Sequence, residues 1–233
     1  MNLANKILSP LAHLFYPHIC AGCGSDLLSE TNTLCMQCVY ELPHSGYAAV
    51  EDNPVEKIFW GRIEITSAMA EFYFSKGTIV QSLIHQLKYK GNVRVGMLLG
   101  NMIGDSLLTS NRFNDIAALI PMPLTKRKEH MRGYNQAEIL CNGISEVTNI
   151  PIIKEVVIRM KATETQTKKR RGQRWENVEG SFCVINQEKL IGRHLLLVDD
   201  VITTGATLEA CGKAILQIPG TSLSIATLAW ATK

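Results

Sequence analysis

Residues 195–207 read LLLVDDVITTGAT, and this stretch decides how the fold is interpreted. The four apolar residues 195–198 predict a buried strand of a parallel sheet. Two acids, Asp199 and Asp200, follow at its carboxyl end. A loop comes next and leads into a helical pattern; its residues are Thr203, Thr204, Gly205, Ala206 and Thr207. Ligands of open α/β sheets bind where strand ends meet helix N-termini. The stretch therefore predicts a phosphate site whose ligand also offers hydroxyl groups or a metal ion to the acids.

The same run resembles the 5-phosphoribosyl-1-pyrophosphate (PRPP) motif of type I phosphoribosyltransferases, in which two acids precede a T-x-G-x-T loop. The resemblance implies that Asp199 and Asp200 contact the ribose 2′- and 3′-hydroxyls and that residues 203–207 surround the 5′-phosphate. The alternative is an ordinary strand–turn–helix with a capped helix start. Two acids followed by a five-residue loop form a far more specific pattern than a lone glycine motif.

Four cysteines near the start of the chain have the spacing of a metal site: Cys20, Cys23, Cys35 and Cys38. Each C-x2-C pair places two thiolates on one tight turn, and two such turns close a tetrahedral zinc site. Four sulfur ligands leave no open position, so the predicted zinc is structural. Disulfides are the alternative, but no signal peptide precedes the cysteines, which favours a reducing, cytoplasmic location.

Length and composition indicate one α/β domain with a small appendage. The chain has 233 residues, of which 46% are hydrophobic. We expect an N-terminal helix and zinc-ribbon module over 1–45, and a phosphoribosyltransferase-type domain over 60–233. No apolar run is long enough to cross a membrane, so no membrane insertion is expected.

Apolar periodicity predicts alternating strands and helices, which imply a parallel sheet. The expected strands are 62–74 (as a strand or hairpin), 116–120, 152–158, 181–185, 195–198 and 223–228. The expected helices are 1–17, 77–89, 93–108, 135–147 and 206–217. Residues 44–60 contain Gly46 and Pro54 and follow Pro43, and they are interpreted as a linker.

Positive charge is concentrated in two segments. Residues 126–132 carry +3 and residues 159–174 carry +6, whereas the whole chain carries only +3. Such clustering suits an anion-binding surface. The alternative is two solvated loops.

Residues 121–138, PMPLTKRKEHMRGYNQAE, resemble the signature of the ComF family, also called GntX-like. The signature is written P-x-P-L, a basic run, then R-G-[FY]-N-Q; its matches are Pro121, Pro123, Leu124, Arg132, Gly133, Tyr134, Asn135 and Gln136. A short K-Y-x-G element matches at Lys88, Tyr89 and Gly91, and a third pattern matches at Arg159, Thr165, Gln166, Arg174, Asn177 and Phe182. The family commonly has Arg where this chain has Lys128, which keeps the charge but loses the bidentate fork.

This resemblance implies an α/β type I phosphoribosyltransferase fold with a parallel central sheet, preceded by the four-cysteine module. It implies that Arg132, Lys126 and Lys128 lie beside the pyrophosphate of PRPP, that Lys88 belongs to the same site, and that Mg²⁺ accompanies PRPP. Residues 160–177 occupy the place of a hood and would carry 168–171 over the site.

The acceptor half of the site is poorly indicated. Hypoxanthine-type enzymes have Asp where this chain has Thr203, which disfavours nucleobase salvage. Tyr134 and Trp175 suit either base stacking or local packing.

The ComF family is associated with DNA uptake during natural competence. The resemblance therefore implies a PRPP-binding protein linked to DNA uptake, with single-stranded DNA and the uptake machinery as further partners. The alternative is an active PRPP-dependent glycosyltransferase in nucleotide or nucleobase metabolism. Whether the protein turns PRPP over stays open at this point.

Overall fold

The computed structural model describes residues 19–26, 32–160 and 182–231. The predicted helix over 1–17 lies outside these ranges. So do residues 161–177 of the predicted hood, with its basic run 168–171 and Trp175.

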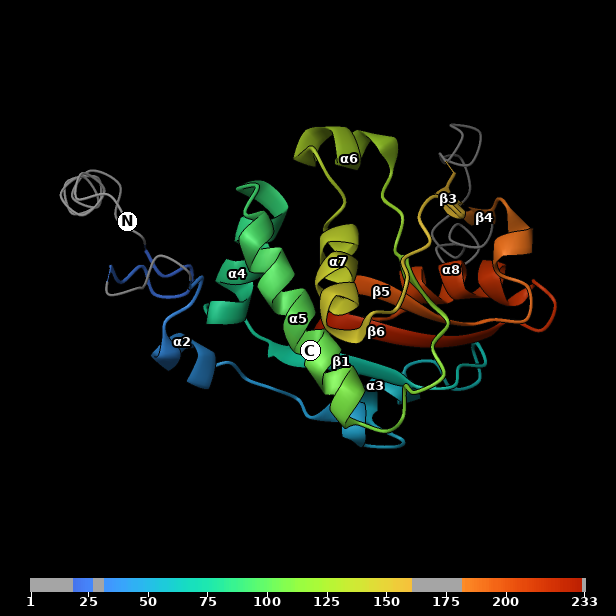
Figure 1. Ribbon diagram of the computed structural model, residues 1–233, viewed down its shortest axis with the longest axis horizontal. Coiled ribbons are helices and arrows are strands. Elements are labelled where there is room, and N and C mark those ends of the chain that lie inside the picture. Colours follow the sequence, from blue (N-terminus) through green and yellow to red (C-terminus); the bar gives the residue numbers. More distant parts are fainter. Residues whose placement is uncertain (1–18, 27–31, 161–181, 232–233) are drawn as a thin grey trace, which may run out of the picture.

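A parallel sheet forms the centre of the protein (Figure 1). Among the described residues it has four strands in the order β1-β6-β5-β2, which are Ala68–Phe74, Ser222–Ala231, His194–Ile202 and Ala118–Pro121. Every neighbouring pair is parallel, and Leu197 at the centre pairs with Ile225 on one side and Ile120 on the other. The prediction of an α/β fold with a parallel central sheet is confirmed.

Helices cover both faces of this sheet. The apolar sides of α4 (Ile79–Tyr89), α5 (Val93–Thr109) and α7 (Gln136–Thr148) form one core with it, and α3 (Pro54–Lys57) and α8 (Ala206–Leu216) contribute to the other. Helices α5 and α7 lie against each other through Gly100 and Gly143, where an added Cβ would collide with the partner helix backbone. No helix in the described ranges is long and apolar enough to cross a membrane.

Strand β5 is longer than the sequence predicts. It continues to Ile202, so Asp199 and Asp200 lie within the strand and not after it. The reason is its neighbour β6, which keeps pairing through Val201↔Ala229 and Ile202↔Trp230. Strand β1, in contrast, is shorter than predicted and begins only at Ala68.

The prediction of a linker over 44–60 is wrong. This segment contains a 3₁₀ turn, η1 (Tyr47–Ala49), and α3. The Asn53 side chain caps α3 by accepting from the N–H groups of Val55 and Glu56, and its amide donates to the carbonyl of Ala68 in β1. Val55 and Phe59 are fully buried, so the segment belongs to the core.

Two further elements differ from expectation. The predicted strands around 152–158 and 181–185 form a separate antiparallel pair, β3 (Val157–Arg159) and β4 (Phe182–Val184). Only the start of the first contacts the central sheet, where Ile152 forms an isolated parallel bridge with Leu119 of β2. The basic run after β2 forms an unpredicted helix, α6 (Lys126–Arg132), which has no buried residue. The other short elements are α2 (Met36–Tyr40) and η3 (Gln187–Lys189).

Candidate functional site

The acid pair lies where one side of β5 loses its partner. The last pairing of β2 with β5 is Pro121↔Val198, followed by a hydrogen bond from the Met122 N–H to the Val198 carbonyl, 2.8 Å. Within the described ranges, β5 then continues with β6 alone. The pairing of β2 with β5 therefore stops one residue before Asp199.

The two acids have different surroundings, because adjacent strand residues point to opposite faces. Asp200 forms an ion pair with Lys88 of α4, with 2.8 Å between Oδ2 and Nζ. Asp199 Oδ1 accepts a hydrogen bond from the Asp200 N–H, 2.8 Å. The structure thus brings three of the predicted site residues together.

Burial and the neighbouring Asp200 raise the pKa of Asp199 to about 7, against the opposing effects of the Asp200 N–H, Lys88 and Arg159. Asp199 therefore changes protonation near neutral pH. A partly buried carboxyl that titrates in this range at the end of a strand is typical of a functional site.

The loop after β5 leaves the start of α8 open. Thr203 and Thr204 are exposed, and Gly205 adopts a left-handed conformation with φ 71°. A Cβ at Gly205 would lie 2.6 Å from Ile58 Cγ2. Glycine is therefore required both by the backbone conformation and by the close contact with Ile58. Gly205 has no side chain to cap α8, and the Ala206 N–H donates a long hydrogen bond to Thr204 Oγ1, 3.5 Å. Among the described residues no side chain accepts from the next N–H groups, those of Thr207 and Leu208, which are therefore available to an anion.

Two sequence motifs that are far apart in the chain meet beside the acids. The guanidinium of Arg132 lies 5.6 Å from the ring centre of Tyr89, the residue after Lys88. The Tyr134 hydroxyl donates to the carbonyl of Leu87, and burial raises the pKa of Tyr134. Tyr134 therefore packs locally, and its hydroxyl is engaged with α4.

Asn135 anchors the second of these motifs to the sheet. Its Oδ1 caps α7 by accepting from the Ala137 N–H, 3.0 Å, and its Nδ2 donates to the carbonyl of Met122, 3.0 Å. Arg132 Nη1 donates to the buried Gln136 side chain. The R-G-Y-N-Q segment thus holds Arg132 near the end of β2.

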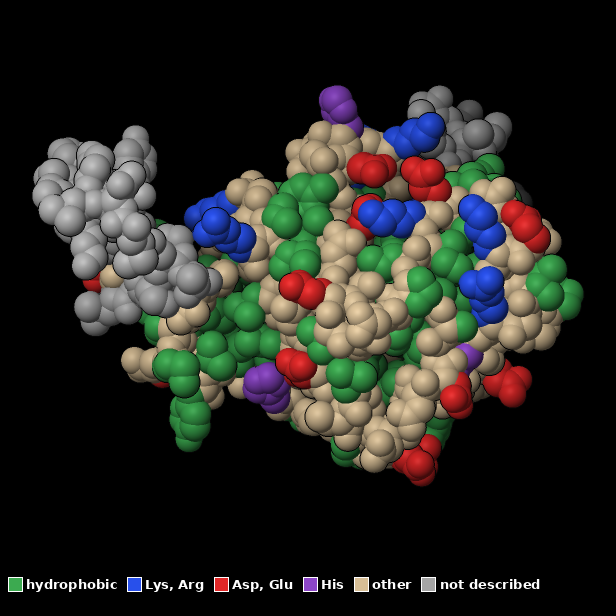
Figure 2. Space-filling view, viewed as in Figure 1, with side chains coloured by type: hydrophobic (Ala, Val, Ile, Leu, Met, Phe, Trp, Pro, Cys, Tyr) green, Lys and Arg blue, Asp and Glu red, His purple; other side chains and the backbone are tan. Residues whose placement is uncertain are grey.

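Lys126 and Lys128 occupy α6, whose three basic residues 126–128 are exposed. Thr125 begins this helix by accepting from the Lys128 N–H, and Gly133 ends it with φ 77°. Figure 1 shows α6 raised away from the sheet, above the start of α7. In Figure 2 the Lys and Arg side chains lie toward the top of this face, whereas Asp and Glu extend to its lower edge. The structure does not bring Lys126 or Lys128 into an ion pair with either acid.

Sequence reasoning assigned no role to three residues around this site. Arg159 on β3 is close enough to lower the pKa of Asp199 and lies over the Phe182 ring, 5.2 Å. Arg62 contacts the loop at Thr204 and pairs with Glu209, which lies in the first turn of α8. Arg159 matched a family pattern, but no signal in the sequence pointed to Arg62 or Glu209.

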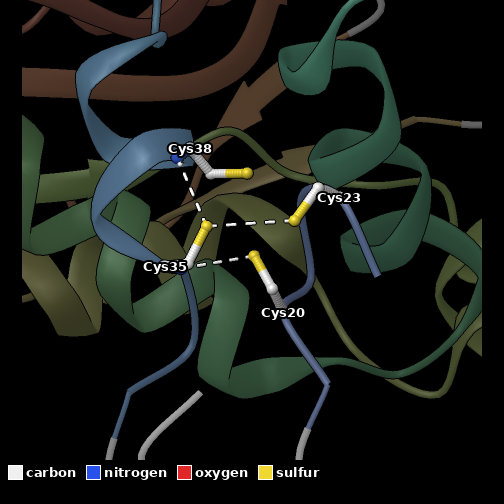
Figure 3. A group of neighbouring side chains, drawn as sticks. All are labelled: Cys20, Cys23, Cys35 and Cys38. Atoms are coloured by element: carbon white, nitrogen blue, oxygen red, sulfur yellow. Dashed lines mark hydrogen bonds between the residues drawn. The ribbon is translucent and has the colours of Figure 1, made fainter. Parts of the chain in front are cut away.

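The four cysteines converge on one point (Figure 3). Their sulfur atoms all lie within 4.8 Å of one another, and Cys23 Sγ is 3.8 Å from Cys35 Sγ. That separation is too long for a disulfide, about 2.05 Å. It is close to the spacing of about 3.8 Å that tetrahedral Zn–S bonds of about 2.3 Å require. The cysteines are thus positioned to bind a metal ion, and the geometry fits structural zinc.

Backbone N–H groups prepare this cluster for a cation. Burial tends to raise the pKa of Cys20, but N–H groups of Cys23, Cys35 and Gly22 outweigh it and lower the pKa to about 6. The Cys35 N–H donates to Cys20 Sγ at 3.2 Å. Burial and the three neighbouring thiols raise the pKa of Cys38. A Cβ at Gly22 would lie 2.7 Å from Cys38 Sγ, so glycine is needed there.

The cluster also contacts the helix that carries Lys88. Gln86 on α4 donates to the carbonyl of Ala21, 2.5 Å, and Cys38 packs in the same apolar core as Leu83 and Leu87. The cysteine cluster and the acid pair are therefore connected through α4.

The structure thus defines an α/β protein whose parallel central sheet carries this acid pair and loop at its carboxyl end and is joined to a four-cysteine cluster. No family model matches the sequence. The chain is a homologue of DNA utilization and competence proteins, which confirms the resemblance to the ComF family. It is 28% identical to the DNA utilization protein YhgH of Shigella flexneri over 206 residues, 85% of this chain and 84% of that protein.

Two other relatives carry competence names. The chain is 26% identical to competence protein F of Haemophilus influenzae over 88% of this chain and 93% of that one. It is 24% identical to competence protein ComFC of Bacillus subtilis over 85% and 78%. Solved structures with similarity include a Trypanosoma cruzi hypoxanthine phosphoribosyltransferase, with TM-score 0.38 and 14% identity over 59% of this chain and 66% of that one. Another is a Neisseria gonorrhoeae protein with bound ppGpp, with TM-score 0.36 and 14% identity over 73% and 76%.

Proposed function

We propose that this protein binds PRPP with Mg²⁺ at the carboxyl end of β5 and acts in DNA uptake, as the names of its homologues suggest. The observation that carries the proposal is the continuity of β5, the acid pair and the open start of α8 within one short stretch. In this assignment Asp199 and Asp200 accept hydrogen bonds from the ribose hydroxyls. Residues 203–207 surround the 5′-phosphate.

The cations around the acids fit the other end of PRPP. Lys88 and Arg132 come from the two motifs that meet at α4, and Arg159 approaches from β3. Their charges favour a pyrophosphate group, and bound Mg²⁺ would neutralise it further. Lys126 and Lys128 are exposed on α6, the helix that ends with Arg132, and are assigned to the same pyrophosphate group.

The four cysteines are assigned to one structural zinc ion. Four sulfur ligands complete its coordination, so its role is to hold the N-terminal segment against α4. A four-thiolate site requires reduced cysteines, which supports a cytoplasmic location.

An active glycosyltransferase is the second candidate. In that reaction an acceptor nucleophile forms a bond to the anomeric carbon of PRPP as the bond to pyrophosphate breaks. Thr203 and Thr204 of the loop are exposed, so an acceptor could approach the loop from solvent. Release of pyrophosphate with a nucleobase acceptor would favour this function over binding alone.

Single-stranded DNA is proposed as a further partner. The three consecutive cations 126–128 on α6 are exposed, so the phosphate groups of a nucleic-acid backbone can reach them. The basic run 168–171 belongs to the same proposal but lies outside the described residues.

Calorimetric titration with PRPP and Mg²⁺ tests the main proposal. Asp200→Asn preserves the shape of the side chain but removes its charge, and it should weaken PRPP binding at least about tenfold. Asp105→Asn, at an exposed acid on α5, is the matched control and should bind like the wild type. Equal affinities of the wild type and both variants would contradict the proposed site.

A further inference from the structure

We propose that Arg62 is a positioning residue for the 5′-phosphate site: it holds the loop at Thr204 and neutralises Glu209 in the first turn of α8. This inference rests on the proposed function, because it concerns the phosphate end of the PRPP site. Arg62 itself would not touch the ligand. It lies in the segment that the sequence indicated only as the start of a strand, outside every motif that matched the ComF family.

Arg62 contacts the loop and two elements that flank it. Its Nη1 donates to the carbonyl of Thr204, 2.8 Å, and to the carbonyl of Ile58, 3.0 Å. Its Nη2 forms an ion pair with Glu209 of α8. The guanidinium therefore joins the loop, the segment after α3 and the helix that follows the loop. Because the guanidinium engages the Thr204 carbonyl, it favours a loop conformation in which that oxygen does not face an incoming phosphate.

The Arg62 side chain has a rigid base. Ile58 and Phe59 contact the loop at Gly205, where there is no space even for a Cβ. The segment before them is anchored by the buried Asn53 side chain and by Glu56, which pairs with Arg112 at 2.6 Å. Arg62 thus links the loop to a segment that is anchored in the core.

Glu209 gives Arg62 its second role. A carboxylate in the first turn of a helix stabilises the helix itself, but it opposes a phosphate that binds the same N-terminus. Arg62 compensates this charge together with Lys213, whose Nζ lies 3.2 Å from Glu209 Oε1. The Arg62 and Glu209 side chains are only 24% and 15% exposed, so solvent screens their charges incompletely.

The two roles predict different results for two variants. Arg62→Met removes both the hydrogen bonds and the charge. Adding Glu209→Gln to Arg62→Met removes the carboxylate that Arg62 no longer neutralises but cannot restore the contact with Thr204. The double variant should therefore recover part of the lost phosphate affinity and none of the lost order in the loop. Lys57→Met is the matched control, because it removes an exposed cation from the same segment with no contact to the loop.

Two measurements on the full chain test this inference. Ribose 5-phosphate, pyrophosphate and PRPP with Mg²⁺ serve as probes in calorimetric titrations. Arg62→Met should weaken ribose 5-phosphate and PRPP equally, by about tenfold, and pyrophosphate by less than about twofold. Glu209→Gln in that background should restore about threefold. Equal weakening of all three probes would mean a general structural defect and would overturn the inference.

Hydrogen–deuterium exchange of residues 203–209 in the ligand-free protein is the second measurement. Arg62→Met should accelerate exchange there and leave residues 118–121 of β2 unchanged, whereas Lys57→Met should change neither. Unchanged exchange of the loop would overturn the positioning role, even if phosphate binding fell. If the wild type binds none of the probes, the PRPP proposal fails, and the exchange experiment still decides whether Arg62 positions the loop.

Discussion

Replacing Asp199 with Asn should stabilise the ligand-free protein above neutral pH while weakening PRPP binding. The pKa of Asp199 is about 7 in the folded protein and 3.8 in the reference state, with burial and Asp200 as the main causes. Between these values the unfolded chain releases the proton and the folded protein keeps it. The stability contributed by Asp199 is therefore complete below about pH 4 and is lost as the pH rises to 7.

The size of this effect follows from the same two values. At 1.36 kcal/mol for each unit of pKa, ionising Asp199 costs the folded protein about 3 kcal/mol between pH 5 and pH 8. The Asn variant mimics the neutral acid and avoids this cost. Its unfolding free energy should exceed that of the wild type by a margin that grows with pH, up to this value. Urea unfolding of both proteins at pH 5, 6, 7 and 8 gives the margin directly.

The control for this experiment is Asp105→Asn, which should show no growing margin, because Asp105 is exposed on α5. A margin for Asp199→Asn that stays constant with pH would refute the electrostatic reasoning. PRPP affinity should fall at least about tenfold in the same variant at pH 8, where the wild-type carboxylate is ionised. A stabilised variant that still bound PRPP with wild-type affinity would show that Asp199 does not belong to the ligand site.

Three further predictions concern other parts of the site. Lys88→Met should raise the pKa of Asp199 further, because it removes a cation that lowers that pKa; carboxyl ¹³C shifts against pH measure it, and an unchanged titration would contradict the ion-pair geometry. Cys35→Ser should abolish stoichiometric zinc in metal analysis and increase proteolysis near residues 19–42 while the sheet stays folded, and zinc retention would contradict the assignment. Replacing residues 126–128 with Gln should weaken single-stranded DNA binding and reduce its salt slope by about 0.7 for each lost phosphate contact. Gln at the exposed Lys189 and Arg193 is the control, and DNA binding indifferent to both changes would exclude α6 as the contact.

Apolar patterns in the sequence predicted the elements that build the sheet layers. The helices over 77–89 and 93–108 and the strand at 195–198 are present because their apolar positions face a core. The end of β5 was not predictable in this way, since it depends on how far β6 continues as a partner. Likewise, β3 and β4 pair with each other and not with the sheet, which apolar content cannot indicate.

Helices α6 and α3 were not predicted, although each has a recognisable start in the sequence. Helix α6 begins at Thr125 as a side-chain cap and ends at Gly133, but it buries nothing and so has no apolar periodicity. The Pro54 that suggested a linker is instead the first residue of α3, where proline is favoured after a capping Asn53.

Only those residues of the candidate site that belong to a sequence motif could be predicted. Residues 199–207 and the cysteine spacing pointed to chemistry by themselves, and Lys88 entered through a resemblance. Its partner Asp200 lies 112 positions later in the numbering, so their ion pair required the fold. Arg62 and Glu209 are ordinary charges in the sequence and become relevant only because they meet at the start of α8.

The most direct test of the central claim is a titration of ¹⁵N-labelled protein with PRPP and Mg²⁺, followed by backbone amide NMR. The account predicts saturable shifts of the amides of 199–200 and 203–207, with the largest changes at the N-terminus of α8. Ribose 5-phosphate alone should shift 203–207, whereas pyrophosphate alone should shift the surroundings of Lys88 and Arg132. Shifts confined to other parts of the protein, or no saturable shift with PRPP, would contradict the claim that β5 ends in a PRPP site.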